Sequence, residues 1–302
     1  MKISIVTPTY NRATLLNKLY ESIYENCKDS DFQVEWLIMD DGSTDDTKTV
    51  VEKFEKNSRF KIKYFYQENA GKMQALNNLT QKCEGELIIE CDSDDYFSED
   101  AFKIIEETIK KNHDFNDIYA FVFLKYDQNG NNMGNDFPKN NYKSNMFDLY
   151  FKEGITGEKV LVFNANIRKK YQYELENNEK FITEARLYHK IDLKYNVKCF
   201  NKKIMICEYR EDGYSKNLNN MFTQYPYGYF QYFKEMFEHN LKGIQLKKRM
   251  YLYKHYILFA TLTKQKKILR NVKGLGNKIA IAILYIPGKI VTKKKFKDAI
   301  KG

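Results

Sequence analysis

Cysteine pairs and long apolar runs are missing from this sequence. The five cysteines of the 302-residue chain are odd in number and form no C-x-x-C pair, which argues against a disulfide framework or a zinc site and favours a reducing compartment. No run approaches the roughly eighteen apolar residues that a bilayer span requires. The first residues turn polar at Thr7, too early for the apolar part of a signal peptide. We therefore expect a cytoplasmic protein.

The glycine motifs of common nucleotide-binding proteins are missing as well. No G-x-G-x-x-G follows the first apolar run, which argues against a dinucleotide-dependent oxidoreductase. No G-x-x-x-x-G-K-[ST] occurs, so a P-loop is excluded. The acidic stretch at 92–95 does not fit an EF-hand, because Tyr96 stands where the third ligand belongs and no glycine follows.

Acidic residues are nearly absent from the last fifth of the chain. Residues 240–302 hold 17 of the 50 lysines and arginines but only one of the 40 acidic residues, Asp298, so residues 1–239 keep 33 basic and 39 acidic side chains. The net charge of +10 therefore divides into −6 for the body and +16 for the tail. This asymmetry predicts a basic appendage that meets an anionic surface.

Apolar runs alternate with helical patterns through the first hundred residues. The runs at 3–6, 34–39, 62–66 and 87–90 are each followed by a stretch with helical spacing. We expect the first strand to end at Pro8, because proline cannot continue a central strand. Four strand-then-helix units predict an α/β fold with a doubly wound, mostly parallel sheet. Further strands are expected at 118–124, 159–164 and 203–207.

Polar residues gather where these strands end. In such sheets, ligands bind beyond the carboxyl ends of the strands. Three carboxylates occupy four positions in 92–95 and repel one another unless a cation lies against them; Mg²⁺ or Mn²⁺ holding a diphosphate would supply it. We predict a pocket for a nucleoside diphosphate with a metal, with an acidic turn before a helix as the alternative. The candidate residues for this pocket are Thr7, Pro8, Thr9, Asp41, Lys72, Asp92, Ser93 and Asp94.

Four motifs together resemble a known family. They are P-T-Y-N-R at 8–12, M-D-D-G-S-T-D-D-T at 39–47, N-A-G-K-x-x-A-L-N at 69–77 and D-S-D-D at 92–95. In this order and spacing they resemble the family 2 glycosyltransferases with the GT-A fold, densely over about residues 1–115. The resemblance implies an inverting transfer from a nucleotide sugar, such as a UDP-sugar, in bacterial surface polysaccharide synthesis.

The resemblance also implies roles on the nucleoside side. Pro8 and Thr9 would touch the nucleoside through their loop. Asp41 would hydrogen-bond the base, usually uracil, and Lys72 matches a basic position near the pyrimidine. The alternatives are that Asp41 only shapes its turn and that Lys72 is an ordinary cation at a helix start.

The resemblance also implies roles for the acidic residues at 92–95, which would lie on the diphosphate side of the site. Asp94 would be the direct ligand of Mn²⁺ or Mg²⁺ and would bridge to the diphosphate. Asp92 would approach the ribose or the same metal. Asp95 would support the cluster or cap the next helix. The metal would neutralise charge on the leaving group.

An inverting transfer needs a carboxylate that takes the proton of the acceptor hydroxyl. In the family this is an acidic residue at a helix start, often written E-D. This chain has T-E at Thr183 and Glu184, so Glu184 is the predicted base from its position, with Glu179 as the alternative. The alternative is that Glu184 has no catalytic role and is a surface acid paired with Arg186 or Lys180.

A polar segment at 208–215 is similar to one that folds over the diphosphate in related enzymes. Arg210 or Ser215 would contact phosphate on closure, with Gly213 as a hinge. An ordinary turn explains the same pattern.

The tail contains an apolar stretch at 279–286 between Lys278 and Lys289. Eight residues are too few to span a bilayer but suit shallow insertion at an anionic surface. A helix docked on the catalytic domain with a solvated basic face is an equal alternative. Nucleic acid is not an expected partner, because no recognised motif accompanies the charge.

The expected organisation has two parts. Residues 1–220 would form the catalytic domain, with a nucleotide-sugar half at 1–115 and an acceptor half at 116–220, and 221–302 a helical basic region. The expected acceptor is a glycan or a lipid-linked glycan, and the expected location is cytoplasmic, with peripheral attachment to the inner face of the cell membrane if the tail binds lipid. A sugar nucleotidyltransferase and a non-catalytic sugar- or membrane-binding scaffold are the alternative functions.

Overall fold

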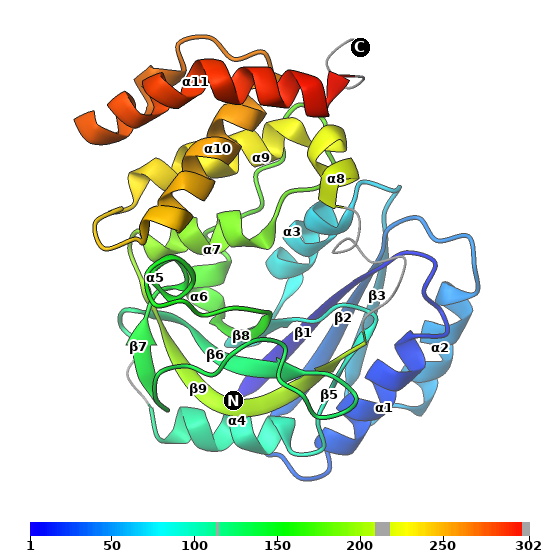
Figure 1. The fold of residues 1–302 in the computed structure, drawn as a ribbon. Helices are drawn as coiled ribbons and strands as arrows, with labels where there is room; N and C mark the ends of the chain where they lie inside the picture. Colours follow the sequence, from blue (N-terminus) through cyan, green and yellow to red (C-terminus); the bar gives the residue numbers. More distant parts are fainter. Residues whose placement is uncertain (113–114, 209–217, 298–302) are drawn as a thin grey trace.

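A computed structural model describes residues 1–112, 115–208 and 218–297 (Figure 1). Its strands are β1 (Lys2–Thr9), β2 (Gln33–Asp40), β3 (Lys61–Tyr66), β4 (Leu87–Glu90), β5 (Asp95–Phe97), β6 (Ile118–Tyr126), β7 (Tyr142–Ser144), β8 (Lys159–Asn164) and β9 (Asn196–Cys207). Its helices are α1 (Leu16–Asn26), α2 (Thr47–Asn57), α3 (Lys72–Lys82), α4 (Ala101–Lys110), α5 (Met146–Phe151), α6 (Ala165–Arg168), α7 (Glu184–Asp192), α8 (Leu218–Gln224), α9 (Pro226–Glu235), η2 (Met236–Glu238), α10 (Leu246–Leu262), η3 (Ile268–Asn271) and α11 (Leu275–Lys295).

The described strands form one sheet in the order β3-β2-β1-β4-β8-β6-β9-β5, with β7 paired to β9. The first four strands run parallel. β8 is antiparallel to both of its neighbours, and β6 and β9 are again parallel to each other. The expected doubly wound, mostly parallel α/β sheet is confirmed, and the central strands are buried apolar runs, as strands covered on both faces must be.

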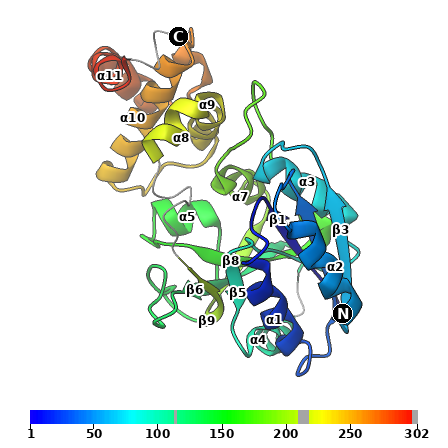
Figure 2. The ribbon, with the colours of Figure 1, turned by 90° about the vertical axis from the view of Figure 1, so that its right-hand side faces the viewer.

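Helices cover both faces of the sheet (Figure 2). One apolar core gathers α1, α2 and α4 against the sheet, with Trp36 fully buried in it. The other gathers α3, α5 and α7 on the opposite face, through residues such as Leu76 and Leu187. The two cores fix the strand ends between them, and these ends carry the polar residues singled out in the sequence.

Pro8 does not end the first strand. β1 continues through Thr9, and Pro8 pairs with Met39 of β2. The expectation was wrong because the pairing of β1 with β4 stops at Val6 and Glu90. Beyond that point β1 has a neighbour on one side only, so a missing N–H can be accommodated.

The acidic stretch contains a short strand that the sequence pattern does not reveal. Asp95–Phe97 forms β5 and pairs antiparallel with β9, Asp95 lying opposite Cys207. Asp95 is therefore held in the sheet. The loop that projects from β4 is reduced to the residues between Glu90 and Asp95.

The C-terminal helices stack above the sheet, with α11 farthest from it (Figures 1 and 2). Buried residues of α9 and α10, such as Phe233 and Tyr256, belong to the same apolar core as α3 and α7. Gly288 of α11 lies so close to α10 that a Cβ there would stand 2.9 Å from Ile257 Cγ2. The helical region is therefore packed on the remainder of the chain; a domain boundary at residue 220 stays a prediction.

One expectation about the tail is wrong. The apolar stretch at 279–286 is part of α11, which continues through Pro287 to Lys295 and is long and apolar enough to cross a membrane by length and composition. The predicted apolar stretch stops just before Pro287, but the proline ring removes only one helical hydrogen bond, and the helix continues beyond it. Only 11% of the apolar window of α11 is buried.

Candidate active site

The carboxyl ends of β1, β2 and β4 meet at one edge of the sheet. Thr9 pairs with Asp40, and the backbone N–H of Asp41 donates to Thr9 O at 2.8 Å. The N–H of Cys91, just past β4, donates to Val6 O at 3.0 Å. This register brings the loop after β2 and the acidic loop after β4 to either side of β1, as the strand-end argument predicts.

The side chains at the end of β1 differ in what they contact. The Thr7 hydroxyl is fully buried and accepts a hydrogen bond from Trp36 Nε1 at 2.9 Å, so it is used in the core. Thr9 is 3% exposed, and its Oγ1 has no hydrogen-bond partner among the described residues. A buried hydroxyl without a partner costs stability unless a ligand or water satisfies it. Thr9 Oγ1 is thus a buried polar atom at this edge without a partner in the described part of the chain.

Asp41 organises the loop that precedes α3. Its Oδ1 accepts from Ala70 N at 2.7 Å and from Gln67 Nε2 at 2.8 Å, and its Oδ2 accepts from Gly71 N at 2.9 Å. Gly71 has a φ of 92°, and a Cβ there would lie 2.3 Å from Lys180 O. Only glycine fits this turn, which delivers Lys72 as the first residue of α3.

Lys72 connects two of the predicted site carboxylates. Its Nζ lies 2.7 and 2.8 Å from the two oxygens of Asp92 and 3.0 Å from Glu184 Oε1. Burial alone would lower the pKa of Lys72, but the charges of Asp92 and then Glu184 outweigh it and raise the pKa well above its usual range. For Asp92, burial would raise the pKa, but Lys72 and then Lys125 hold it below its ordinary value. Lys72 and Asp92 therefore stabilise each other's charged forms.

The neighbouring carboxylates have their own cations. Asp95 accepts from Lys125 Nζ at 2.7 Å, and Glu158 lies 3.3 Å from the same nitrogen. Glu90, the last residue of β4, accepts from the buried Arg168 at 2.7 Å and from the Tyr173 hydroxyl at 2.8 Å. These two clusters fix both ends of the acidic loop. The sequence pattern does not reveal these clusters, because nothing local links Lys125 or Arg168 to that loop.

Asp94 differs from its neighbours. Among the described residues it forms no ion pair, and burial together with the charges of Asp92 and Asp95 raises the pKa of its carboxyl. No group of three or more histidines, cysteines or carboxylates in a metal-binding arrangement occurs in the described part of the chain. Mg²⁺ and Mn²⁺ are often held by only one or two carboxylates plus substrate phosphates, so the predicted metal role of Asp94 and Asp92 does not require a larger cluster and stays a prediction.

The two candidate bases lie in different surroundings. Glu184 is the first residue of α7, and its carboxylate pairs with Lys72 rather than with Arg186 or Lys180. Glu179 instead accepts from Tyr227 N at 2.8 Å and from Gly228 N at 2.7 Å. It therefore caps the N-terminus of α9 with both oxygens. Burial raises the pKa of Glu179, which those two backbone hydrogen bonds partly offset.

The predicted phosphate contacts Arg210 and Ser215, and the hinge Gly213, lie outside the described residues. Ser93 is described and is 8% exposed between the two metal candidates. The structure therefore gathers Thr9, Lys72, Asp92, Ser93, Asp94 and Glu184 at one edge, with Asp41 behind the loop that carries Lys72.

Comparison with known proteins identifies the family of the chain. Residues 4–172 match the family model described as glycosyl transferase family 2. An uncharacterized glycosyltransferase of Mycoplasma genitalium is 34% identical over 114 residues, which are 37% of this chain and 38% of that protein. A GalNAc(5)-diNAcBac-PP-undecaprenol beta-1,3-glucosyltransferase of Campylobacter jejuni is 28% identical over 236 residues, which are 74% of this chain and 72% of that protein. The chain thus spans about two-fifths of the length of the first of these relatives.

Solved structures with the same fold extend over nearly the whole chain. Residues 1–349 of Staphylococcus aureus TarS in complex with UDP-GlcNAc match with a TM-score of 0.62 at 17% identity, covering 98% of this chain and 92% of that one. A Pyrobaculum calidifontis mannosyltransferase in complex with GDP-Man and Mn²⁺ matches with a TM-score of 0.55 at 17% identity, covering 99% and 85%. Since the family model covers more than half of the residues, the chain belongs to the family 2 glycosyltransferases.

Proposed function

We propose that this glycosyltransferase moves a sugar from a UDP-sugar to a glycan or lipid-linked acceptor, with inversion at the anomeric carbon, in the synthesis of a bacterial surface polysaccharide. The observation that carries the proposal is the contact of Lys72 with both Asp92 and Glu184. It joins the end of β4, where a diphosphate would bind, to the start of α7, where an acceptor would be deprotonated. The UDP-GlcNAc complex of TarS, a protein of the same fold, supports the choice of nucleotide.

The donor side of the proposal uses the edge formed by β1, β2 and β4. Pro8 and Thr9 would contact the nucleoside, with the unpartnered Thr9 Oγ1 as a hydrogen-bonding atom. Asp41 would hold the loop of Gly71 and Lys72 in place, and whether it also reaches the base stays a prediction. Asp94 and Asp92 would hold Mn²⁺ or Mg²⁺, which would neutralise charge on the departing diphosphate.

On the acceptor side, Glu184 would act as the base. Its carboxylate would take the proton of the acceptor hydroxyl as that oxygen bonds to the anomeric carbon. The bond from that carbon to the diphosphate oxygen breaks in the same step, and the electron pair leaves with UDP. Attack from the face opposite the leaving group inverts the configuration. Glu179 is a poorer candidate, because both of its oxygens are used by backbone N–H groups.

The acceptor and the location complete the proposal. The Campylobacter relative is named for a lipid diphosphate acceptor, and an acceptor of that kind would lie in a membrane. The tail of this chain has the charge to meet an anionic surface, as its 17 basic residues and single acid indicate. We therefore place the enzyme on the inner face of the cell membrane.

The test is hydrolysis of nucleotide sugars by the full chain, with water as the acceptor. Nucleoside diphosphate release is measured over a panel of UDP-, GDP- and dTDP-sugars with Mn²⁺ and with EDTA. The proposal predicts release from UDP-sugars that EDTA and Asp94→Ala both abolish. Formation of a nucleotide sugar from a sugar phosphate would identify a nucleotidyltransferase instead. No release in any arm, with the protein folded, would favour a scaffold.

A further inference from the structure

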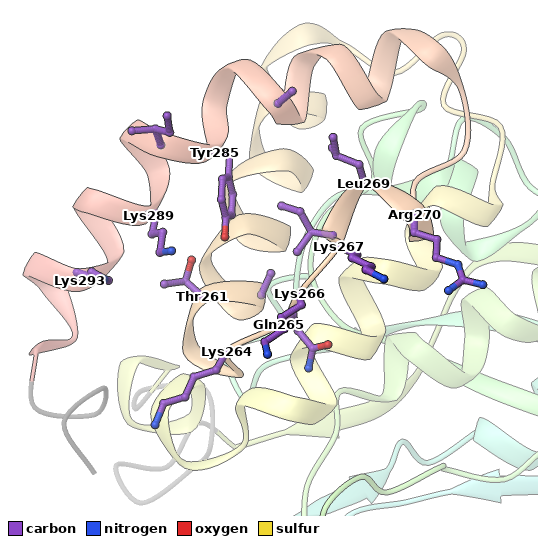
Figure 3. Close-up of a pocket in the computed structure, with 14 residues that line it drawn as sticks. Thr261, Lys264, Gln265, Lys266, Lys267, Leu269, Arg270, Tyr285, Lys289 and Lys293 are labelled. Atoms are coloured by element: carbon purple, nitrogen blue, oxygen red, sulfur yellow. The ribbon is translucent and has the colours of Figure 1, made fainter.

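A pocket lies far from the sheet edge, between α10, η3 and α11 (Figure 3). Its volume is about 910 Å³. Tyr285, Lys289 and Lys293 line it from α11, and Thr261 lines it from α10. The segment between these helices supplies the remaining charge. The six cations of the lining are Lys264, Lys266, Lys267, Arg270, Lys289 and Lys293.

These six side chains have no counter-charge. In the part of the chain that the structure describes, none of them forms an ion pair with a carboxylate, and no carboxylate lines the pocket. Lys289 does lie over the ring of Tyr285, 5.5 Å from its centroid. Cations that line a cavity without acids create a positive potential that attracts an anion. The lining also contains apolar residues, among them the buried Ile268 and the exposed Ala282.

An exposed apolar stripe of α11 adjoins this pocket. Its side chains recur at intervals of three and four residues and therefore lie on one side of the helix. They are 52–75% exposed: Leu275, Ile279, Ile283, Ile286 and Ile290. Ile286 belongs to both the stripe and the pocket lining. An apolar stripe of this extent on one exposed helix face marks an interaction site.

The helix packs in a way that favours lying on a membrane over crossing it. Ile281 and Thr292 are buried, and Gly288 is in close contact with Ile257 of α10. Lysines are also spread along the helix, at Lys278 and Lys289 and at its end. A helix held along its length by another helix, with charges at several levels, suits the membrane interface.

From the charge, the stripe and the packing, we infer that α11 lies in the headgroup layer of an anionic phospholipid bilayer and that the pocket behind it takes the phosphate of one headgroup. The stripe would insert beside the acyl chains. The pocket cations, which border the stripe through Ile286, would then stand at the depth of the phosphates. This deepens the membrane location of the proposed function and rests on it, but it uses none of the active-site residues.

The experiment is flotation of the full chain with vesicles of phosphatidylcholine, with and without phosphatidylglycerol. The double variant Lys289→Glu and Lys293→Glu alters the pocket. Its control, Lys294→Glu and Lys295→Glu, makes the same charge change on the same helix outside the pocket lining. Each cation near an anionic surface contributes about fivefold to binding. We expect the pocket variant to lose at least about tenfold more affinity for phosphatidylglycerol vesicles than the control. Equal losses would contradict the binding of a headgroup phosphate in the pocket.

A second pair of variants tests the stripe. Ile279→Ser with Ile283→Ser should weaken vesicle binding by at least about tenfold, because two apolar side chains no longer insert. The control replaces exposed apolar residues elsewhere, Leu193→Ser with Leu246→Ser, and should bind as the wild type does. Unchanged vesicle binding of the stripe variant would contradict the insertion of this face of α11 into the bilayer. If bound wild type resists alkaline carbonate extraction, α11 crosses the membrane and the inference is wrong.

Two further measurements distinguish an error in the lipid assignment from an error in the proposed function. If inorganic phosphate raises the melting temperature of the wild type and vesicles do not bind, the pocket is a site for free anions and the lipid assignment is wrong. UDP binding is measured on every variant and should not change. Vesicle binding without any UDP binding would contradict the proposed function alone, and UDP binding without vesicle binding would contradict this inference alone.

Discussion

The amino group of Lys72 lies 3.0 Å from the carboxylate of Glu184, a residue 112 positions away in the sequence. The same nitrogen contacts both oxygens of Asp92. The lysine is 20% exposed at its side chain, so its charge is only partly screened by water. One cation therefore fixes the relative position of the proposed metal carboxylate and the proposed base.

Replacing this cation should destabilise the protein. In Lys72→Gln, Glu184 would lose its cation and Asp92 would keep only the charge of Lys125, and we expect the free energy of unfolding to fall by about 1–3 kcal/mol. Because the pKa of Asp92 is held low by Lys72, the stability that it contributes is present above its unfolded pKa and is lost as the pH falls through the folded value; the variant should lose this contribution. Urea unfolding at neutral and acidic pH measures both.

A matched control for Lys72 is Lys48→Gln. Lys48 is 70% exposed and lies 4.0 Å from Glu52, so its replacement should change stability by less than about 0.5 kcal/mol. Equal effects of the two substitutions would show that the charge of Lys72 does not organise the site.

Substitutions of the two candidate bases should cause different defects, a loss of transfer rate for Glu184 and a loss of stability for Glu179. Glu184→Gln should keep UDP binding and lower the transfer rate by about 10²–10⁴-fold, the usual contribution of a general base. Glu179→Ala should lower stability by about 1–2 kcal/mol through loss of the α9 cap, with the chemical step retained. The measurements are single-turnover rates at saturating donor and thermal unfolding. A large rate loss in Glu179→Ala at full stability would move the base to that residue.

Gly71 offers a test of the loop that carries Lys72. Gly71→Ala combines a positive φ with a Cβ placed 2.3 Å from Lys180 O. Gly154→Ala meets only the backbone cost, since its φ is +80° and nothing lies within 4 Å of its Cβ position. We expect a cost of about 1 kcal/mol for Gly154→Ala and about 1–3 kcal/mol more for Gly71→Ala, from the clash. Similar unfolding midpoints for the two variants would mean that the loop yields without strain.

His189 should make the protein sensitive to acid. It is buried among aromatic rings, and burial together with the charge of His239 lowers its pKa to about 3. The unfolded chain binds the proton near pH 6.5, so stability is full above that value and falls as the pH drops toward 3, by at most about 1.4 kcal/mol per pH unit. His189→Phe should reduce this slope between pH 6 and 4. A slope identical to that of the wild type would assign the acid sensitivity to other groups.

The clustering of the donor-side candidates at one sheet edge could be predicted from the sequence because its signals are local. Asp41, Lys72, Asp92 and Asp94 each follow a strand, and the carboxyl ends of parallel strands meet in space. The doubly wound sheet followed from the same alternation of apolar runs and helical spacing. Thr7 was selected by the same rule, although its hydroxyl contacts Trp36 in the core.

The remaining features depend on contacts between distant residues. Nothing near Glu184 indicates that Lys72 is its partner, and nothing near Glu179 indicates that it caps α9. The three-residue β5 is too short to carry a pattern and exists because β9 pairs with it. The extent of α11 depends on packing against α10, which outweighs the local effect of Pro287.

The central claim is that the acidic loop after β4 binds a nucleoside diphosphate through a divalent ion held by Asp94. Titration calorimetry of UDP into the full chain tests it directly, with Mn²⁺, with EDTA, and for Asp94→Asn with Mn²⁺. The account predicts one UDP site whose affinity falls at least about tenfold when either the ion or the Asp94 carboxylate is removed. Equal UDP affinity in all three titrations would contradict it.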